Sequence, residues 1–297
     1  MTALFAAAVL QRDRLRSQWW AWRLVSTADP RQQAYYLALL AAVGDSASGA
    51  IAGLAADDDP AVRSLAVVAL AALPEGRGVD RLAALLADPD GEVSSSAAVC
   101  LAFMADESPA GGRGLDLLIE AAGRPDTGPA AAAAAALSRV SSPAALNALG
   151  RVAARHPSAW VRAQAVESLA TQAAVRLRPI VGADASPVDF PRVGSGDIID
   201  ALVASLLDDG RFTGELAFER EIARAARFAG SSPASGPAGS GVPTDRRVAD
   251  VAAAGLSVIT GRYIEPADAP AFGSPAEFAA QCRAWVVERR HGDNKIK

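Results

Sequence analysis

The residues in this sequence that could do chemistry are few and far apart. There are two histidines, His156 and His291, and two cysteines, Cys100 and Cys282. Zinc sites built from these residue types need closely spaced pairs of ligands, and no such pairs occur here. His156 falls at a turn, where a capping role is favoured over catalysis, and both cysteines lie in apolar helical patterns typical of core thiols. We therefore expect no catalytic residues, no metal site and no cofactor.

Three further segments match ligand-binding motifs only in part. Asp57–Asp59 could attract calcium but lacks the glycine and glutamate of a calcium-binding loop, so helix capping is favoured. The glycine-rich segment 109–114 lacks the lysine and the preceding strand of a phosphate loop. Trp160 lies close to Arg162, as an aromatic residue and a cation do in some proteins that bind nucleic-acid bases. The favoured interpretation of Trp160 is that it fills space between packed helices.

The composition favours many thin helices over one bulky core. Of the 297 residues, 51% are hydrophobic but only 5% are aromatic, and alanine supplies much of the difference. Alanine is the best helix former and lets helices approach closely. The net charge of -4 disfavours a dedicated nucleic-acid-binding protein, which usually has an excess of basic residues. No uncharged apolar stretch is long enough to span a bilayer. The two cysteines do not make a disulfide framework, so we expect a cytoplasmic protein.

A helical unit recurs along the first half of the chain. Asp57–Asp59 precede Pro60, which suits the first turn of a helix, and a broad apolar face follows as far as Leu73. Leucines at matching positions are separated by 30, 31, 36 and 32 residues: Leu40, Leu70, Leu101, Leu137 and Leu169. A period of this length predicts hairpins of two helices that bury their apolar faces by stacking on neighbouring copies.

Several of these residues also match a known pattern. The matches are an aspartate in the turn, a proline and a Val-Arg pair, carried by Asp57, Pro60, Val62, Arg63, Asp88, Val161 and Arg162. On these residues the chain resembles the HEAT-repeat family, in its short bacterial type that also occurs in phycobilin-lyase-like proteins. The resemblance implies an all-α, right-handed α-solenoid of the armadillo-like helical class. It also implies a ladder of aspartates and arginines between repeats, which Ser94 interrupts because it replaces an arginine.

These observations predict four parts of the chain. We expect a capping helix in residues 1–28, HEAT-like repeats in 29–175, divergent helices that form an irregular cap in 176–290, and a tail in 291–297. A disordered loop is expected at 230–243, where glycine, serine and proline dominate. Helices are expected at about 197–207, 215–229, 245–260 and 274–290, with Asp197 and Thr244-Asp245 as caps.

The first helix has two interpretations. Residues 2–26 place large apolar side chains roughly on one face: Leu4, Phe5, Ala8, Val9, Leu15, Trp19 and Trp22. Tryptophans together with several arginines could bind an anionic membrane surface. The favoured interpretation is that these large side chains point inward and cover the open end of the repeat array.

The predicted function is a non-catalytic scaffold that binds a protein partner on the face lined by the second helix of each hairpin. The candidate contact residues are Arg63, Ser94, Trp160, Arg162 and Glu167. The alternative is a ligand- or nucleic-acid-binding protein with lyase-like or glycosylase-like activity, as the family resemblance implies. An arginine-rich face would favour an anionic ligand, and an apolar face would favour a protein. A deep pocket with convergent acids would favour an enzyme.

Overall fold

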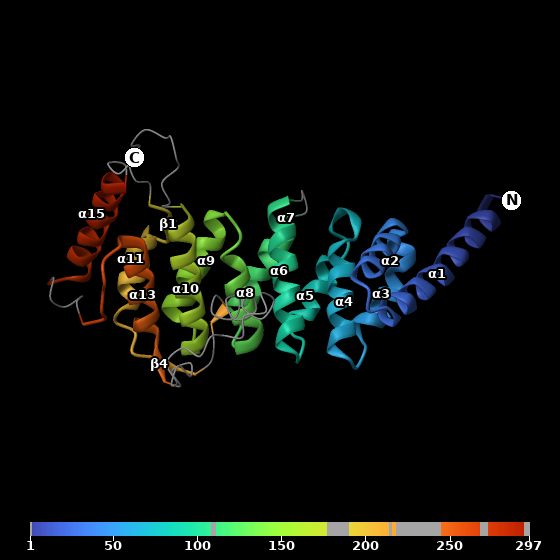
Figure 1. Ribbon diagram of the computed structural model, residues 1–297, viewed down its shortest axis with the longest axis horizontal. Coiled ribbons are helices and arrows are strands. Elements are labelled where there is room, and N and C mark those ends of the chain that lie inside the picture. Colours follow the sequence, from blue (N-terminus) through green and yellow to red (C-terminus); the bar gives the residue numbers. More distant parts are fainter. Residues whose placement is uncertain are drawn as a thin grey trace. The chain divides into compact units, whose positions relative to one another are not determined.

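The computed structural model describes residues 2–107, 111–176, 190–213, 216–217, 245–267 and 273–293 (Figure 1). The chain divides into two compact units, residues 1–121 and 122–297. We call them unit 1 and unit 2 and describe each by itself. The predicted loop at 230–243 and most of the predicted helix at 215–229 lie outside the described residues.

Unit 1 consists of helices that follow one another in short hairpins. Its elements are α1 (Thr2–Ser26), α2 (Pro30–Ala42), η1 (Gly44–Ala47), α3 (Ser48–Ala55), α4 (Pro60–Ala71), η2 (Pro74–Gly76), α5 (Val79–Leu85), α6 (Gly91–Glu107) and α7 (Gly111–Ala122). Helix α4 packs against α3 in its own hairpin and against α6 of the next hairpin, and α2 packs against α4. The hairpins α3–α4 and α5–α6 are therefore adjacent layers, as the period predicts.

Unit 2 continues the helical pattern and adds two small strand pairs. Its elements are α8 (Thr127–Leu137), α9 (Pro143–Arg155), α10 (Ala159–Arg176), β1 (Arg192–Val193), β2 (Gly196–Asp197), α11 (Ile198–Ser205), β3 (Arg211–Phe212), β4 (Arg246–Arg247), α13 (Val248–Thr260) and α15 (Pro275–Asp293). Strand β1 pairs with β2 and β3 pairs with β4, both antiparallel. In the described part of residues 2–176 there is no strand.

Several helices begin in the same way, at a polar residue followed by proline. The side chains of Asp29, Asp59 and Ser142 accept hydrogen bonds from the backbone N–H two residues later, at 2.9, 2.9 and 3.2 Å. Proline follows each of them at the first helical position, where an N–H would have no partner within the helix. These local signals are readable in the sequence, which is why the starts of these helices were predictable.

The repeating leucines form the core. Leu40, Leu70, Leu101, Leu137 and Leu169 are all 0% exposed. Alanine fills the space between them, most densely in α8, where Ala130–Ala134 are buried. Small side chains let neighbouring helices approach closely, so this composition suits stacked layers better than a single large core. The predicted register of the repeat is confirmed.

The predicted orientation of α1 is wrong where its side chains are described. Leu15, Trp19 and Trp22 are 64%, 53% and 60% exposed. The buried residues of α1 are Ser17, Ala21 and Leu24, which lie on the opposite side of the helix at about 100° per residue. Small side chains allow closer packing, and the Ser17 hydroxyl contacts the Ser46 carbonyl oxygen of η1 at 3.1 Å. The side chains of Leu4, Phe5, Ala8 and Val9 lie outside the described part of the helix.

Two predicted boundaries also differ, and one helix begins where glycine is abundant. Helix α7 begins at Gly111, inside the glycine-rich segment 109–114. Helix α13 begins after Arg247 and not at Asp245, because β4 pairs with β3 up to that residue. Thr244, the other predicted cap residue, lies outside the described residues. Helix α15 continues to Asp293 and so includes part of the predicted tail.

No single helix among the described residues has both the length and the apolar composition to cross a bilayer. Helix α2 and the following segment Gly44–Ala55 reach that length only when joined, and they are bent by 118°. Leu40 and Ile51, one from each part, are fully buried in unit 1.

Candidate interaction site

The turn between the two helices of a hairpin is built in the same way in four places. A ring nitrogen or carboxylate oxygen of the first turn residue accepts the N–H two residues later. This contact is 2.9 Å at Asp57, 2.9 Å at Asp88, 3.1 Å at His156 and 2.8 Å at Asp208. Because Nδ1 of His156 accepts this bond, Nε2 carries the proton and donates to the Arg124 carbonyl oxygen at 2.8 Å. The predicted turn role of His156 is confirmed.

An arginine joins one such turn to the next in unit 1. Nε and Nη2 of Arg63 each donate to the Asp88 carboxylate at 2.8 Å. Nη1 donates to the carbonyl oxygens of Asp57 and Asp58 at 2.9 and 3.0 Å. The hydrogen bond from Arg63 is the main cause that lowers the pKa of Asp88. Arg63 therefore links its own turn to the turn of the following repeat.

Arg162 repeats this geometry in unit 2. Its Nε and Nη2 donate to the Asp208 carboxylate at 2.6 and 2.9 Å, and its Nη1 donates to the carbonyl oxygens of His156 and Pro157 at 2.8 and 3.1 Å. The hydrogen bond from Arg162 is again the main cause that lowers the pKa of Asp208. A bidentate pair of this kind is stronger than two separate hydrogen bonds between neutral groups.

The position of Asp208 reveals a further repeat that the sequence reasoning did not identify. Helix α11 precedes this turn and packs on α9, while α13 follows it and packs on α10. The two helices are separated by residues 206–247, so the usual period is lost. The sequence signal that could have revealed the repeat is Asp208-Asp209-Gly210, which is similar to the turn at Asp88–Gly91.

The five predicted contact residues are divided between the two units. Arg63 and Ser94 belong to unit 1, and Trp160, Arg162 and Glu167 belong to unit 2. Ser94 is buried, and its hydroxyl donates to the Leu86 carbonyl oxygen at 2.6 Å. Nε1 of Trp160 is buried without a hydrogen-bond partner among the described residues. Both arginines are held in the turn-to-turn pairs, and contact between these five residues and a partner stays a prediction.

A different set of residues forms an exposed apolar surface in unit 1. Tyr35 of α2, Val68 of α4, and Val99 and Phe103 of α6 are 61%, 46%, 41% and 62% exposed. We call this set the second-helix face of unit 1. The sequence carries no charge at residues 35–42, 64–72 and 93–105 of these three helices. Arg31 lies one turn before Tyr35, and Asp106 and Glu107 lie one turn after Phe103, so charged residues border this uncharged surface. Large exposed apolar side chains in an area poor in charge are typical of surfaces that bind proteins.

The matching positions in unit 2 have the opposite chemistry. Gln164, Glu167 and Thr171 of α10 lie 68 residues after Ser96, Val99 and Phe103. The backbone N–H of Ala217 donates to Oε1 of Gln164 at 2.9 Å, and Nε2 of Gln164 donates to Glu167 at 2.8 Å. Leu216 is 1% exposed, so the chain itself packs over this part of α10.

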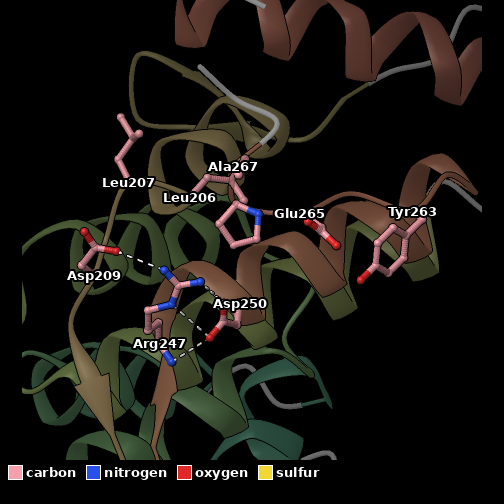
Figure 2. Close-up of a pocket in the computed structure, with 9 residues that line it drawn as sticks. Leu206, Leu207, Asp209, Arg247, Asp250, Tyr263, Glu265 and Ala267 are labelled. Carbon is pink, nitrogen blue, oxygen red and sulfur yellow. Dashed lines mark hydrogen bonds and ion pairs between the residues drawn. The ribbon is translucent and has the colours of Figure 1, made fainter. Parts of the chain in front are cut away.

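Unit 2 also contains a pocket of about 530 Å³ (Figure 2). Its lining residues are Leu206, Leu207, Asp209, Arg247, Asp250, Tyr263, Glu265, Pro266 and Ala267. Arg247 lies between two carboxylates, with Nη2 at 2.8 Å from Asp250 and Nη1 at 3.5 Å from Asp209. Burial acts to raise the pKa of Asp250, but hydrogen bonds and the charge of Arg247 lower it overall. An acid with a lowered pKa holds no proton to donate near neutral pH.

No histidine, cysteine, serine or threonine is among these lining residues. Within the described residues, no cluster of three or more His, Cys, Asp or Glu side chains could hold a metal ion. The titratable residues that line the pocket are therefore Asp209, Arg247, Asp250, Tyr263 and Glu265.

The stacked hairpins, the shared turns and the arginine pairs define an α-helical repeat protein. A family model described as HEAT repeats matches residues 17–102 and 79–170, which together cover more than half of the chain. The chain belongs to the HEAT-repeat family, and its fold is an α-solenoid. A search of curated proteins finds no match.

Proposed function

We propose that this protein is a non-catalytic scaffold and that the second-helix face of unit 1 binds a protein partner. The observation that carries the proposal is the exposure of Val68, Val99 and Phe103 on adjacent helices with no charged residue between them. Interface cores are depleted in charge and enriched in aromatic residues, and this face has both properties. HEAT repeats form helical scaffolds that commonly bind proteins, which agrees with this assignment.

The chemistry of the face favours a protein over an anionic ligand. A nucleic acid or an anionic pigment needs arginine or lysine side chains that are available for phosphate or carboxylate contacts. In the three second helices of unit 1 the positive charges are Arg31, at the start of α2, and Arg63, which is held by Asp88. An apolar segment of a protein partner fits this surface better, because such a segment can place its large side chains at helical spacing.

The enzymatic alternative has less support. The lyase-like or glycosylase-like activity implied by the family resemblance would need a proton donor and a nucleophile that both face the substrate, and two acids of the pocket, Asp209 and Asp250, are engaged by Arg247. A cytoplasmic location is part of the proposal, since both described cysteines are free thiols. Burial raises the pKa of Cys282 to about 11, so this thiol is unreactive and serves the core.

The experiment compares capture of partners from native extract by the wild-type chain and by two variants. The double variant V99E/F103T gives unit 1 the residues that unit 2 has at the matching positions. The control variant V258E changes a valine of α13 that is 63% exposed in unit 2. The captured protein is then purified, and its affinity for each variant is measured by calorimetry.

We expect V99E/F103T to bind the partner about 100-fold more weakly, because two central contacts of an interface commonly contribute at least about 1 kcal/mol each and a buried glutamate adds a penalty. V258E should bind as the wild type does. Equal binding by wild type and V99E/F103T, or loss of binding in V258E alone, would show that the partner uses another surface.

A further inference from the structure

Helix α1 presents a second exposed apolar surface, which shares no residue with the second-helix face of unit 1. Leu15, Trp19 and Trp22 are each more than half exposed and lie at spacings of four and three residues. Residues at these spacings lie along one side of a helix. The three side chains therefore form a continuous apolar stripe, which we call the α1 stripe.

Packing inside the protein does not account for this stripe. Helix α15 shows how a terminal helix closes the core in this chain: Phe278, Cys282 and Val286 point inward and are at most 2% exposed. Helix α1 does the reverse, since it packs through Ser17, Ala21 and Leu24 and leaves Trp19 and Trp22 outside. Large aromatic side chains in water are unfavourable unless something else covers them.

Positive charge surrounds the stripe. Residues 11–26 contain four arginines and one aspartate, a net charge of +3 in a chain whose total is -4. Arg12, Arg14 and Arg16 are exposed. At about 100° per residue, Arg14 lies on one side of the stripe and Arg12 and Arg16 lie on the other. Cationic side chains on both edges of an apolar stripe are typical of helices that lie in a bilayer interface.

Arg23 orders the aromatic side chains. Its guanidinium carbon lies 5.9 Å from the ring centre of Trp19, 6.0 Å from that of Trp22 and 5.7 Å from that of Tyr36. Nε of Arg23 also donates to the Tyr36 hydroxyl at 3.0 Å. The indole rings are thus held in place before any partner arrives, which reduces the entropy lost on binding.

We propose that the α1 stripe binds the surface of a lipid bilayer that contains anionic headgroups, with α1 lying in the plane of the interface. Tryptophan is enriched at membrane interfaces because its ring is amphipathic, and arginine reaches anionic headgroups from the edges of the stripe. A second copy of this chain is disfavoured as the occupant, because two α1 helices would bring like charges together. The helix would anchor unit 1 peripherally and would not cross the membrane.

The test uses the full chain with vesicles of phosphatidylcholine alone and with vesicles of phosphatidylcholine and phosphatidylglycerol. Binding is followed by sedimentation and by the shift in tryptophan fluorescence. The variant L15S/W22S removes apolar area, R12Q/R14Q removes charge, and V68S is a control that removes an exposed apolar side chain elsewhere in unit 1. Circular dichroism checks that each variant keeps the wild-type fold, which is expected because every changed residue is exposed.

We expect the wild type and V68S to bind the anionic vesicles, with a blue shift in fluorescence and weaker binding at high salt. R12Q/R14Q should bind about 25-fold more weakly, since each arginine near an anionic surface contributes about fivefold. L15S/W22S should lose most binding. No binding to anionic vesicles, or equal binding by L15S/W22S and wild type, would overturn the proposal. The proposal would also be overturned if α1 bound a protein or a nucleic acid and did not bind vesicles.

Discussion

The second helices of unit 1 and unit 2 share a register but differ in what covers them. Val99 and Phe103 of α6 are exposed, whereas Glu167 and Thr171 occupy the matching positions of α10. Near these two residues, Gln164 accepts a hydrogen bond from Ala217, a residue that follows the turn of the next repeat. The helices have the same role in the stack, so the fold does not decide which face is open. A few side chains and one inserted segment decide it.

Both units contain an arginine–aspartate pair that links two turns. We expect substitutions in these pairs to lower the free energy of unfolding more than the other changes below. We expect Arg162→Met to lower the free energy of unfolding by about 2 kcal/mol, because Asp208 loses both hydrogen bonds of a partly buried pair and two carbonyl oxygens lose a donor. Urea unfolding followed by circular dichroism measures the effect. Arg63→Met should destabilise unit 1 in the same direction, because its contacts with Asp88 are equivalent.

The double variant R63E/R162E separates this structural role from the predicted role in partner contact. The geometry predicts that its melting temperature falls. A variant that melts like the wild type but no longer captures the partner would assign both arginines to the binding surface instead.

The effect of Arg162→Met should depend on pH. Arg162 lowers the pKa of Asp208 in the folded state, so this carboxylate stabilises the fold above its unfolded pKa of about 4 and loses that contribution as pH falls further. The difference in unfolding free energy between wild type and Arg162→Met should therefore narrow below about pH 4. Urea titrations at several acidic pH values check this, and a difference that stays constant would mean that the ion pair contributes nothing.

The packing of Ala217 against α10 in unit 2 depends on a smaller interaction, a single hydrogen bond to Gln164. We expect Gln164→Ala to lower the unfolding free energy by about 1 kcal/mol, since the Ala217 N–H loses its acceptor. Hydrogen exchange of the Ala217 amide should become faster. The matched control is Ser96→Ala, which changes the equivalent position of unit 1. Unchanged exchange at Ala217 in Gln164→Ala would show that other contacts hold the segment.

The open face of unit 1 should contribute least to stability. We expect V99E/F103T to change the unfolding free energy by less than about 0.5 kcal/mol, because both side chains are already exposed. The variant should also bind less of a hydrophobic fluorescent dye than the wild type. A loss of stability comparable to that of Arg162→Met would mean that these side chains belong to the core.

The sequence was sufficient to predict the repeat and its register, but not which face of each helix is exposed. Leu70 and Leu101 mark the core because burial recurs with the period, and Asp59-Pro60 marks a helix start through purely local chemistry. The orientation of α1 could not be predicted, because Leu24 on one side and Trp19 on the other are both apolar. Packing against α2, η1 and α3 selects the side with Ser17 and Ala21.

The packing of Ala217 against α10 in unit 2 could not be predicted for a different reason. It depends on a contact between Gln164 and Ala217, which are 53 residues apart. Neither residue belongs to a motif, and Ala217 lies in the segment between Asp208 and α13 that interrupts the final hairpin. The period that identified the earlier repeats therefore gave no signal for this one.

Photo-crosslinking at matched positions tests the central claim most directly. A benzophenone amino acid is placed at Phe103 in one variant and at Thr171 in another, and each protein is irradiated in native extract. The account predicts that residue 103 crosslinks to a partner protein, whereas residue 171 crosslinks within its own chain. A partner crosslinked from residue 171 and none from residue 103 would contradict it.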